Sequence, residues 1–406
     1  MTETEFNPKE KLFHLGKLEG MVLTCIACGD CREAFNITEK PPKLGVCVAR
    51  EHTPGFEPYF GRGKMQIIRS LWQGNLDLSK EMAEVVYQCT TCNACTEACS
   101  YDMDNTALYE ALRADIVDAG CGLETHKPMN EAIVELLNPY QRDNKEKEEW
   151  MQELEFKIKD ASEKTADVFY FVGCTAALTP QIRRVAINTA EILHKLDVDF
   201  SVFGEKEVCC GSVAMRTGDR KAFNYVAEKN ADLFKKSGVK TIITSCAGCY
   251  RTLKLDYKDI MENLDIEVLH TVEFLIKLIE ENKIELKDLG FSVTYHDPCH
   301  TGKHMGGNAL YEEPRNLLNK ISNFTEMKRI KQNAWCCGAG GGVKKGFPDL
   351  ALEISKTRIK EAEETSAEYL VSICPFCYRN LDDAIKELKS EIKMIDLTNL
   401  LNQAID

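Results

Sequence analysis

Residues 241–253 read TIITSCAGCYRTL, and residues 368–381 read EYLVSICPFCYRNL. Each begins as a short apolar and β-branched run that predicts a strand, reaches a cysteine, and continues with helical spacing. A second cysteine follows the first after two residues. Upstream, DVFYFVGC (167–174) resembles SVTYHDPC (292–299) in the same way. The matching cysteines are 125 to 128 residues apart, which indicates a repeated module.

Between the matching strands, each module carries a pair of adjacent cysteines followed by glycine, CCG at 209–211 and at 336–338. Alternating strands and helices predict an α/β fold for both modules, each Rossmann-like. Ligands of open α/β sheets bind beyond the carboxyl ends of the strands, so we expect the five cysteines of each module to converge there. The modules are placed at residues 166–288 and 289–406, after a charged, solvated linker helix at 141–165.

Residues 1–140 are predicted to form an α-helical ferredoxin domain. Residues 89–99 carry four cysteines as C-x2-C-x2-C-x3-C, the spacing of bacterial 4Fe–4S ferredoxins, although Ser100 replaces the usual proline. An earlier run, C-x2-C-x2-C, has Phe35 where its fourth cysteine is expected, and Cys47 follows later. We interpret Cys47 as the displaced ligand; the alternative is a free buried thiol.

The fourth cysteine of such a run binds the other cluster in two-cluster domains. This crossing predicts two cubane 4Fe–4S clusters. The ligands of the first would be Cys25, Cys28, Cys31 and Cys99. The ligands of the second would be Cys89, Cys92, Cys95 and Cys47. Cys121 has no partner at a ligand spacing and is expected to be a buried structural thiol.

The overall composition excludes several classes of protein. The 406 residues are 44% hydrophobic and 28% charged, as in ordinary globular proteins, and the net charge of −13 argues against nucleic acid as the main partner. No apolar stretch is long enough to span a membrane, and the polar N-terminus has no signal-peptide core. We therefore expect a cytoplasmic protein that is at most attached to a membrane through another subunit. Nineteen cysteines in such a chain favour metal ligation over disulfides.

Five thiolates per module are too many for one structural zinc, which takes four ligands, and they favour iron–sulfur chemistry. The two expected ligand sets are Cys174, Cys209, Cys210, Cys246 and Cys249, and Cys299, Cys336, Cys337, Cys374 and Cys377.

In its cysteine motifs and domain order the chain resembles the catalytic D subunit of CoB–CoM heterodisulfide reductase of methanogenic archaea. The resemblance covers nearly the whole chain and includes the domain order. It is carried by FVGCTA (171–176), CCGSVAMRTGD (209–219), SCAGCYR (245–251), HDPCHTGKH (296–304), CCGAGGGVKKGFPDLAL (336–352) and CPFCYRNL (374–381).

The resemblance implies that each module holds a non-cubane 4Fe–4S cluster through its five cysteines. It also implies reduction of the coenzyme M–coenzyme B heterodisulfide, with electrons from a partner protein. That donor would be a membrane cytochrome b, or a soluble flavoprotein or iron–sulfur protein. The alternative is an electron-transfer subunit of a flavin-, quinone- or acyl-CoA-reductase-linked complex without a disulfide substrate. A zinc-bearing assembly module is a third, weaker possibility.

Several residues near the cysteines are further candidates. Histidines 296, 300 and 304 surround Cys299 and could donate protons or hydrogen bonds, or could be structural. The run GAGGGVKKG (338–346) lacks the ending of a phosphate loop, so its glycines are expected to let the backbone approach a cluster. A set of basic side chains, with one histidine, could bind anionic substrate groups in a cleft between the modules, or could be a solvated face. These residues are Arg216, His300, Lys303, Lys344, Lys345 and Arg379.

Overall fold

The computed structural model describes residues 7–33 and 45–405, so Phe35 lies outside the described residues. The chain separates into two compact units. The first unit contains Met1–Pro128, Val213–Arg220 and Trp335–Ser355, and the second contains Met129–Ser212, Lys221–Ala334 and Lys356–Asp406. The compact units therefore do not follow the sequential division expected at residues 140, 165 and 288. A segment that follows the first CCG and a segment that contains the second CCG belong with the N-terminal helices.

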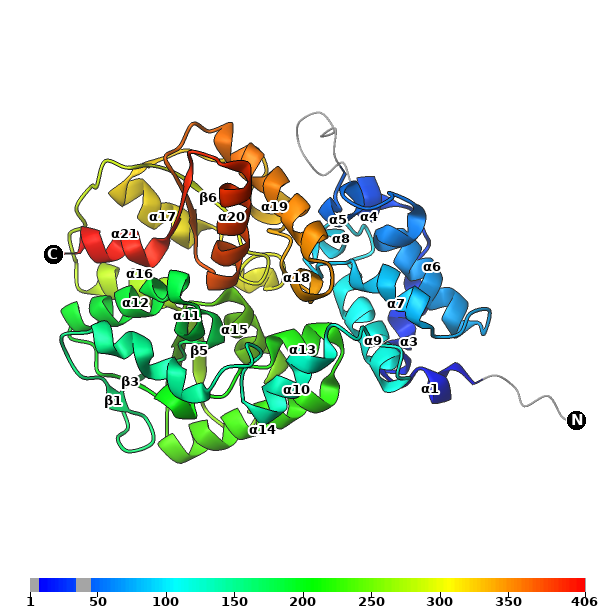
Figure 1. Cartoon of the computed structure of the whole chain (residues 1–406), viewed down its shortest axis with the longest axis horizontal. Coiled ribbons are helices and arrows are strands. Elements are labelled where there is room, and N and C mark those ends of the chain that lie inside the picture. The colour runs from blue at the N-terminus through cyan, green and yellow to red at the C-terminus, as the bar shows by residue number, and fades with distance from the viewer. Residues whose placement is uncertain (1–6, 34–44, 406) are drawn as a thin grey trace, which may run out of the picture. The chain divides into compact units, whose positions relative to one another are not determined.

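The N-terminal region is helical, as the sequence predicts (Figure 1). Its core contains Leu15, Val22, Ile68, Val86 and Leu112, which are fully buried. Burial of such side chains is the main favourable term in holding short helices together. The helices are α1 (Pro8–Lys11), α2 (Phe13–Gly16), α3 (Glu19–Thr24), α4 (Asp30–Glu33), α5 (Val48–Glu51), η1 (Glu57–Tyr59), α6 (Gly61–Trp72), α7 (Lys80–Tyr87), α8 (Ala94–Glu97), α9 (Asn105–Asp118) and α10 (Lys127–Glu135).

Two parallel sheets form the second unit, which confirms the α/β prediction. One sheet has the strand order β1-β3-β2-β4-β5, and the other has β7-β6-β8-β9. Their strands are β1 (Lys159–Asp160), β2 (Val168–Tyr170), β3 (Phe200–Val202), β4 (Thr241–Thr244), β5 (Glu267–His270), β6 (Ser292–Tyr295), β7 (Asn323–Phe324), β8 (Tyr369–Ser372) and β9 (Lys393–Asp396). The apolar repeats at 241–253 and 368–381 therefore supply equivalent central strands, β4 and β8.

Helices follow the strands in both modules. They are α11 (Cys174–Leu178), η3 (Pro180–Ile182), α12 (Arg184–Lys195), η4 (Gly204–Lys206), α13 (Ser212–Thr217), α14 (Arg220–Ser237), α15 (Ala247–Arg251), η5 (Thr252–Asp256), α16 (Thr271–Glu281), η6 (Gly306–Asn308), α17 (Glu312–Ile321), η7 (Lys331–Asn333), α18 (Val343–Gly346), α19 (Pro348–Glu363), α20 (Pro375–Leu388) and α21 (Leu397–Ala404). Within the second unit, α12 of the first module packs against α21 of the second (Figure 1). Asn188 and Asn399 are hydrogen-bonded across this contact, at 2.6 Å.

The expectation of a solvated linker helix at 141–165 is wrong. The segment forms a 3-10 helix, η2 (Asn144–Glu153), and then strand β1. Trp150 and Lys147 are buried, and the Lys147 ammonium donates to the Glu207 carbonyl. The physical reason is the single tryptophan inside the charge run, because its large apolar ring is stabilised by burial.

None of the helices in the described part of the chain combines the length and apolar character needed to cross a bilayer.

Candidate iron–sulfur sites

The first four-cysteine site consists of Cys25, Cys28, Cys31 and Cys99. Burial raises the pKa of the Cys31 thiol to about 12, and the neighbouring thiols of the other three contribute to this rise. A hydrogen bond from Ser100 Oγ to the Asp30 carboxylate ties the two cysteine runs together. All four cysteines belong to the first unit. The grouping is the one that the crossed assignment requires.

The second four-cysteine site consists of Cys47, Cys89, Cys92 and Cys95. These four cysteines line one cavity in the first unit, together with Lys64 and Tyr109. Burial raises the pKa of the Cys47 thiol to about 12; the Lys64 ammonium opposes this rise, and the Cys89 and Cys92 thiols add to it. Cys47 thus lies beside the second cysteine run, where a displaced fourth ligand would have to be.

Tyr109 lies between the two four-cysteine sites. Its hydroxyl donates to Gly61 O at 3.0 Å, and a Cβ atom on Gly61 would stand only 2.9 Å from Cys31 Sγ. Burial raises the pKa of Tyr109 well above its usual value, and nearby Cys95 and Cys31 raise it further. Sequence reasoning missed this residue, because a tyrosine in a helical stretch looks like an ordinary core aromatic.

The first five-cysteine site lies in the second unit. Successive thiols are within hydrogen-bonding reach of one another, in the order Cys174, Cys209, Cys210, Cys249 and Cys246. All five are buried. Hydrogen bonds from the Cys209 and Cys249 thiols lower the pKa of Cys210 to about 6. Five thiols in a continuous chain of contacts, one of them with a lowered pKa, form a donor set larger than one zinc ion takes.

A buried carboxylate supports the turn that presents Cys174. Glu207 accepts hydrogen bonds from the backbone N–H groups of Val172 (2.8 Å) and Gly173 (2.9 Å). Burial raises the pKa of Glu207, and the Lys147 ammonium opposes this rise. Gly173 has φ +78°, a conformation that favours glycine, and a Cβ atom there would lie 3.1 Å from Cys249 Sγ. Sequence reasoning also missed Glu207.

The cysteines of the second module are divided between the two units. Cys299, Cys374 and Cys377 belong to the second unit, whereas Cys336 and Cys337 belong to the first. Their convergence on one cluster stays a prediction. Within the second unit, the Cys246 thiol is within hydrogen-bonding reach of Cys374 as well as Cys249. The cysteine ends of the two modules therefore adjoin there.

The glycine of each CCG adopts a backbone conformation with positive φ and donates a hydrogen bond to a cysteine sulfur. Gly211 and Gly338 have φ of +77° and +90°, and their N–H groups donate to the sulfur two residues earlier, at 3.4 and 3.3 Å. A Cβ atom on Gly338 would stand 2.6 Å from Ala351 O, and one on Gly211 would stand 2.9 Å from Val226. Backbone N–H groups aimed at ligand sulfurs tune iron–sulfur clusters.

The glycine run after Cys337 lies against the second four-cysteine site, within the first unit. A Cβ atom on Gly340 would be 2.7 Å from Thr90 O, and one on Gly341 would be 2.7 Å from Cys89 O. These two glycines thus permit close approach to the backbone that carries Cys89. The expectation that the glycines let the backbone approach a cluster stays a prediction.

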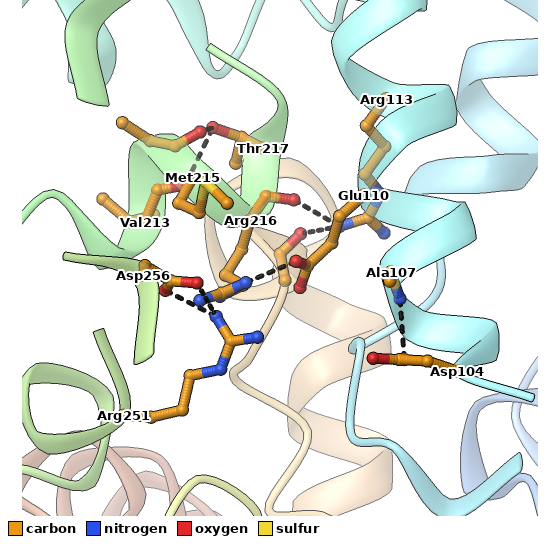
Figure 2. A network of polar contacts seen from close by, with 12 residues as sticks. Asp104, Ala107, Glu110, Arg113, Val213, Met215, Arg216, Thr217, Arg251 and Asp256 are labelled. Atoms are coloured by element: carbon orange, nitrogen blue, oxygen red, sulfur yellow. Dashed lines mark hydrogen bonds and ion pairs between the residues drawn. The ribbon is translucent and has the colours of Figure 1, made fainter. Parts of the chain in front are cut away.

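Arg113 holds the segments of the first unit together (Figure 2). Its guanidinium is fully buried and donates to the carbonyl of Arg216 at 2.8 Å, as Figure 2 shows. It also donates to the carbonyls of Gly341 (2.8 Å), Val86 (3.1 Å) and Cys89 (2.6 Å).

Arg216 itself is buried and forms an ion pair with the buried Glu110 (Figure 2). The structure therefore removes Arg216 from the set that we propose to contact substrate.

The other predicted substrate residues are in varied surroundings. Lys303 is buried and donates to Ala334 O at 2.7 Å. Arg379 is half-buried, with its guanidinium 5.5 Å from the Tyr140 ring. The His300 ring is 4.4 Å from that of His304. Its Nδ1 would be 3.8 Å from a Cβ on Gly248, the residue between Cys246 and Cys249.

Three further expectations concern single residues. Lys344 is half-buried and Lys345 exposed, both in the first unit. Cys121, expected to be buried, is only partly so and packs on the helical core.

Comparison with known proteins agrees with this arrangement. The cysteine-rich domain family CCG matches residues 168–254 and 293–382, and the 4Fe–4S dicluster domain family matches residues 21–103. The D subunit of dihydromethanophenazine:CoB–CoM heterodisulfide reductase from Methanosarcina mazei is 40% identical over 334 residues, covering 80% of this chain and 79% of that protein. The chain belongs to the family of heterodisulfide reductase D subunits. Within this family it is a CCG-domain oxidoreductase with an N-terminal dicluster domain.

More distant proteins share parts of this architecture. EtfAB:quinone oxidoreductase of Syntrophomonas wolfei is 28% identical, covering 94% of this chain and 58% of that protein. The crystal structure of a hypothetical protein from Helicobacter pylori superposes with a TM-score of 0.57 at 12% identity, covering 98% of this chain and 76% of that one. The latter likeness concerns the fold alone.

The thiol groupings fit the iron–sulfur clusters that the two family matches imply. Each four-cysteine site supplies four sulfurs from two separate segments of the first unit, which is the donor number of a 4Fe–4S cluster. The five-thiol site in the second unit offers one more sulfur than that, in buried surroundings.

Proposed function

We propose that this chain reduces a disulfide at two non-cubane 4Fe–4S clusters, fed by two cubane 4Fe–4S clusters. The reaction takes one disulfide, two electrons and two protons and yields two thiols. By its likeness to the Methanosarcina mazei protein, the substrate is the heterodisulfide of coenzyme M and coenzyme B. Clusters bound at these cysteines would supply the electrons one at a time.

The contact between Cys246 and Cys374 carries this proposal. Cleaving an S–S bond needs two electrons at one place and must hold two sulfurs as they separate. In the second unit the cysteine end of one module adjoins that of the other, and His300 stands beside the turn between Cys246 and Cys249. Two adjacent redox groups could each supply one electron to the disulfide, and the nearby His300 imidazole could supply a proton.

The proposed ligands are the eighteen cysteines other than Cys121. The four-cysteine sites hold the cubane clusters. The two sets of five hold the non-cubane clusters, with Cys299, Cys336, Cys337, Cys374 and Cys377 forming the second. Electrons would arrive at the first unit from a partner protein, either a membrane cytochrome b or a soluble flavoprotein or iron–sulfur protein.

Metal analysis and a substrate experiment test the proposal together. Four 4Fe–4S clusters correspond to about sixteen irons per chain and no zinc. In protein with this iron content, reduced by dithionite, added heterodisulfide should oxidise the clusters and change the EPR spectrum. If the clusters are all present and heterodisulfide does neither, the chain does not reduce it.

Single-cysteine variants test the requirement for both modules. Cys210→Ala and Cys337→Ala should each disturb the cluster of one module, yet both should abolish disulfide reduction. If either variant kept most of its turnover, one cluster would be sufficient and the two-cluster reaction would be wrong.

Binding of the anionic ends of the substrate is assigned to Lys344, Lys345 and Arg379. A charge-assisted hydrogen bond contributes about 1.5–3 kcal/mol. The double variant Lys344→Ala, Lys345→Ala should therefore weaken heterodisulfide binding roughly ten- to hundredfold with its iron content unchanged. Unchanged affinity would remove these two lysines from the binding site.

A second candidate function is electron transfer without a disulfide substrate. The likeness to EtfAB:quinone oxidoreductase over 94% of this chain favours it. In that case the four clusters would be present, and heterodisulfide would leave the reduced clusters unchanged. Reoxidation by a quinone through a partner protein would then be the activity to measure.

A further inference from the structure

Lys64 is a buried cation, and no ion pair joins it to a carboxylate among the described residues. Its side chain begins in α6, and the residue is 1% exposed. The ammonium donates to the carbonyl of Pro58 at 3.1 Å. Among residues 7–33 and 45–405, the ion pairs include none with Lys64. Burying an ammonium is costly unless a negative charge compensates it, so the protein must supply that charge from another group.

The second four-cysteine site is the available source of negative charge. Lys64 lines the same cavity as Cys47, Cys89, Cys92 and Cys95. Thiolates bound to iron are anionic, and a 4Fe–4S cluster with four of them becomes more negative when it gains an electron. A nearby fixed cation therefore stabilises the reduced form more than the oxidised form.

Arg113 adds a second positive charge beside this site. Its guanidinium donates to the carbonyl of Cys89 at 2.6 Å and is fully buried. Arg113 and Lys64 therefore act in the same direction.

The first four-cysteine site has a different electrostatic environment. Two cations lie beside it: Arg62 is close enough to Cys31 and Cys28 for their charges to act on it, and the half-buried Arg69 donates to the Cys25 carbonyl at 3.0 Å. Arg62 is paired with the Glu57 carboxylate, so the two charges largely cancel. In addition, Cys28 is exposed, and water screens charges near it.

We propose that Lys64 is a positioning residue that raises the reduction potential of the second four-cysteine site above that of the first. Electrons entering the first unit then collect at the second site. The backbone of Cys89 and Thr90 at this site is in contact with Gly340 and Gly341, which follow Cys337 in the chain. Electrons thus collect beside segment 335–355 of the first unit, which carries Cys336 and Cys337. The inference rests on the proposed cluster ligands, but not on disulfide reduction.

The test is a redox titration of the iron-replete full chain, followed by EPR of the two low-potential clusters. Lys64→Met should lower the equilibrium ratio of electrons at the second site to electrons at the first at least tenfold. For a one-electron couple this is a change of about 59 mV in the difference between the two reduction potentials. Lys64→Gln also removes the charge but keeps a hydrogen-bond donor, and it should give a shift of the same sign. Lys64→Arg keeps the charge and should restore most of the native separation. Lys80→Met, which removes an exposed lysine of α7, is the matched control and should leave both potentials unchanged.

Three results would overturn the proposal. The first is an unchanged separation between the two potentials in Lys64→Met and Lys64→Gln with full iron content, because Lys64 would then be structural. The second is an equal shift of both clusters, which would indicate a general effect of net charge. The third is an absence of iron from the second site of the native protein. Failure of heterodisulfide to react would contradict the proposed function but would leave the potential shift measurable.

Discussion

Replacing Arg113 should release two chain segments from the helical unit. In Arg113→Met the carbonyls of Arg216, Gly341, Val86 and Cys89 lose their donor. A hydrogen bond from a charged donor contributes about 1.5–3 kcal/mol. Each segment, 213–220 and 335–355, loses one such bond, so its local opening free energy should fall by about that amount. This corresponds to roughly ten- to hundredfold faster amide exchange.

Hydrogen exchange with mass spectrometry measures this directly, peptide by peptide. Peptides covering α13 and α18 should exchange faster in Arg113→Met and in Arg113→Lys, because an ammonium cannot reproduce a planar fork of donors. Arg69→Met is the matched control, since Arg69 makes one hydrogen bond to the Cys25 carbonyl, at 3.0 Å. If α13 and α18 peptides exchanged at native rates in both Arg113 variants, the assignment of Arg113 as the connecting residue would be refuted.

Three further predictions concern single residues. Burial lowers the pKa of His126 to about 4; its hydrogen bond to Gly342 opposes this change, and the charges of Arg113 and Lys345 add to it. As pH falls below 6.5, His126 therefore takes up a proton in the unfolded chain before it does so in the native protein. The native protein should lose about 2 kcal/mol of stability by pH 5 relative to His126→Gln. Equal pH dependence of the denaturation midpoints of the two proteins would contradict this. Gly338→Ala should lower iron content and thermal stability more than Gly306→Ala, because both have positive φ but a Cβ at Gly306 meets nothing within 4 Å. Cys47→Ser should remove one low-potential EPR signal, whereas Cys121→Ser should leave all signals intact; a native spectrum from Cys47→Ser would make Cys47 a free thiol.

Local patterns were enough to predict the α/β modules and the helical N-terminal region, and they led to the proposed groups of cysteines. Strands such as β4 and β8 are short apolar runs that end near a cysteine, and their equivalence follows from the repeat in the sequence. The crossed grouping of the two four-cysteine sites was expected from the C-x2-C-x2-C-x3-C run, whose fourth cysteine binds the other cluster in two-cluster domains. The missing cysteine in the first run also led to the assignment of Cys47 as the displaced ligand, which stays a prediction.

Long-range burial and pairing were decided only by the tertiary structure. Arg216 looked like a substrate ligand beside a CCG, but Glu110, more than a hundred residues earlier, neutralises it in the core. Lys64 carried no signal, since a lysine in a helix is usually solvated and only its buried position makes its charge consequential. The joining of residues 213–220 and 335–355 to the N-terminal helices depends on Arg113, whose four acceptors come from three separate stretches of the chain. A sequence pattern records which side chains are near in the chain, whereas electrostatic effects depend on which charges are near in space and shielded from water.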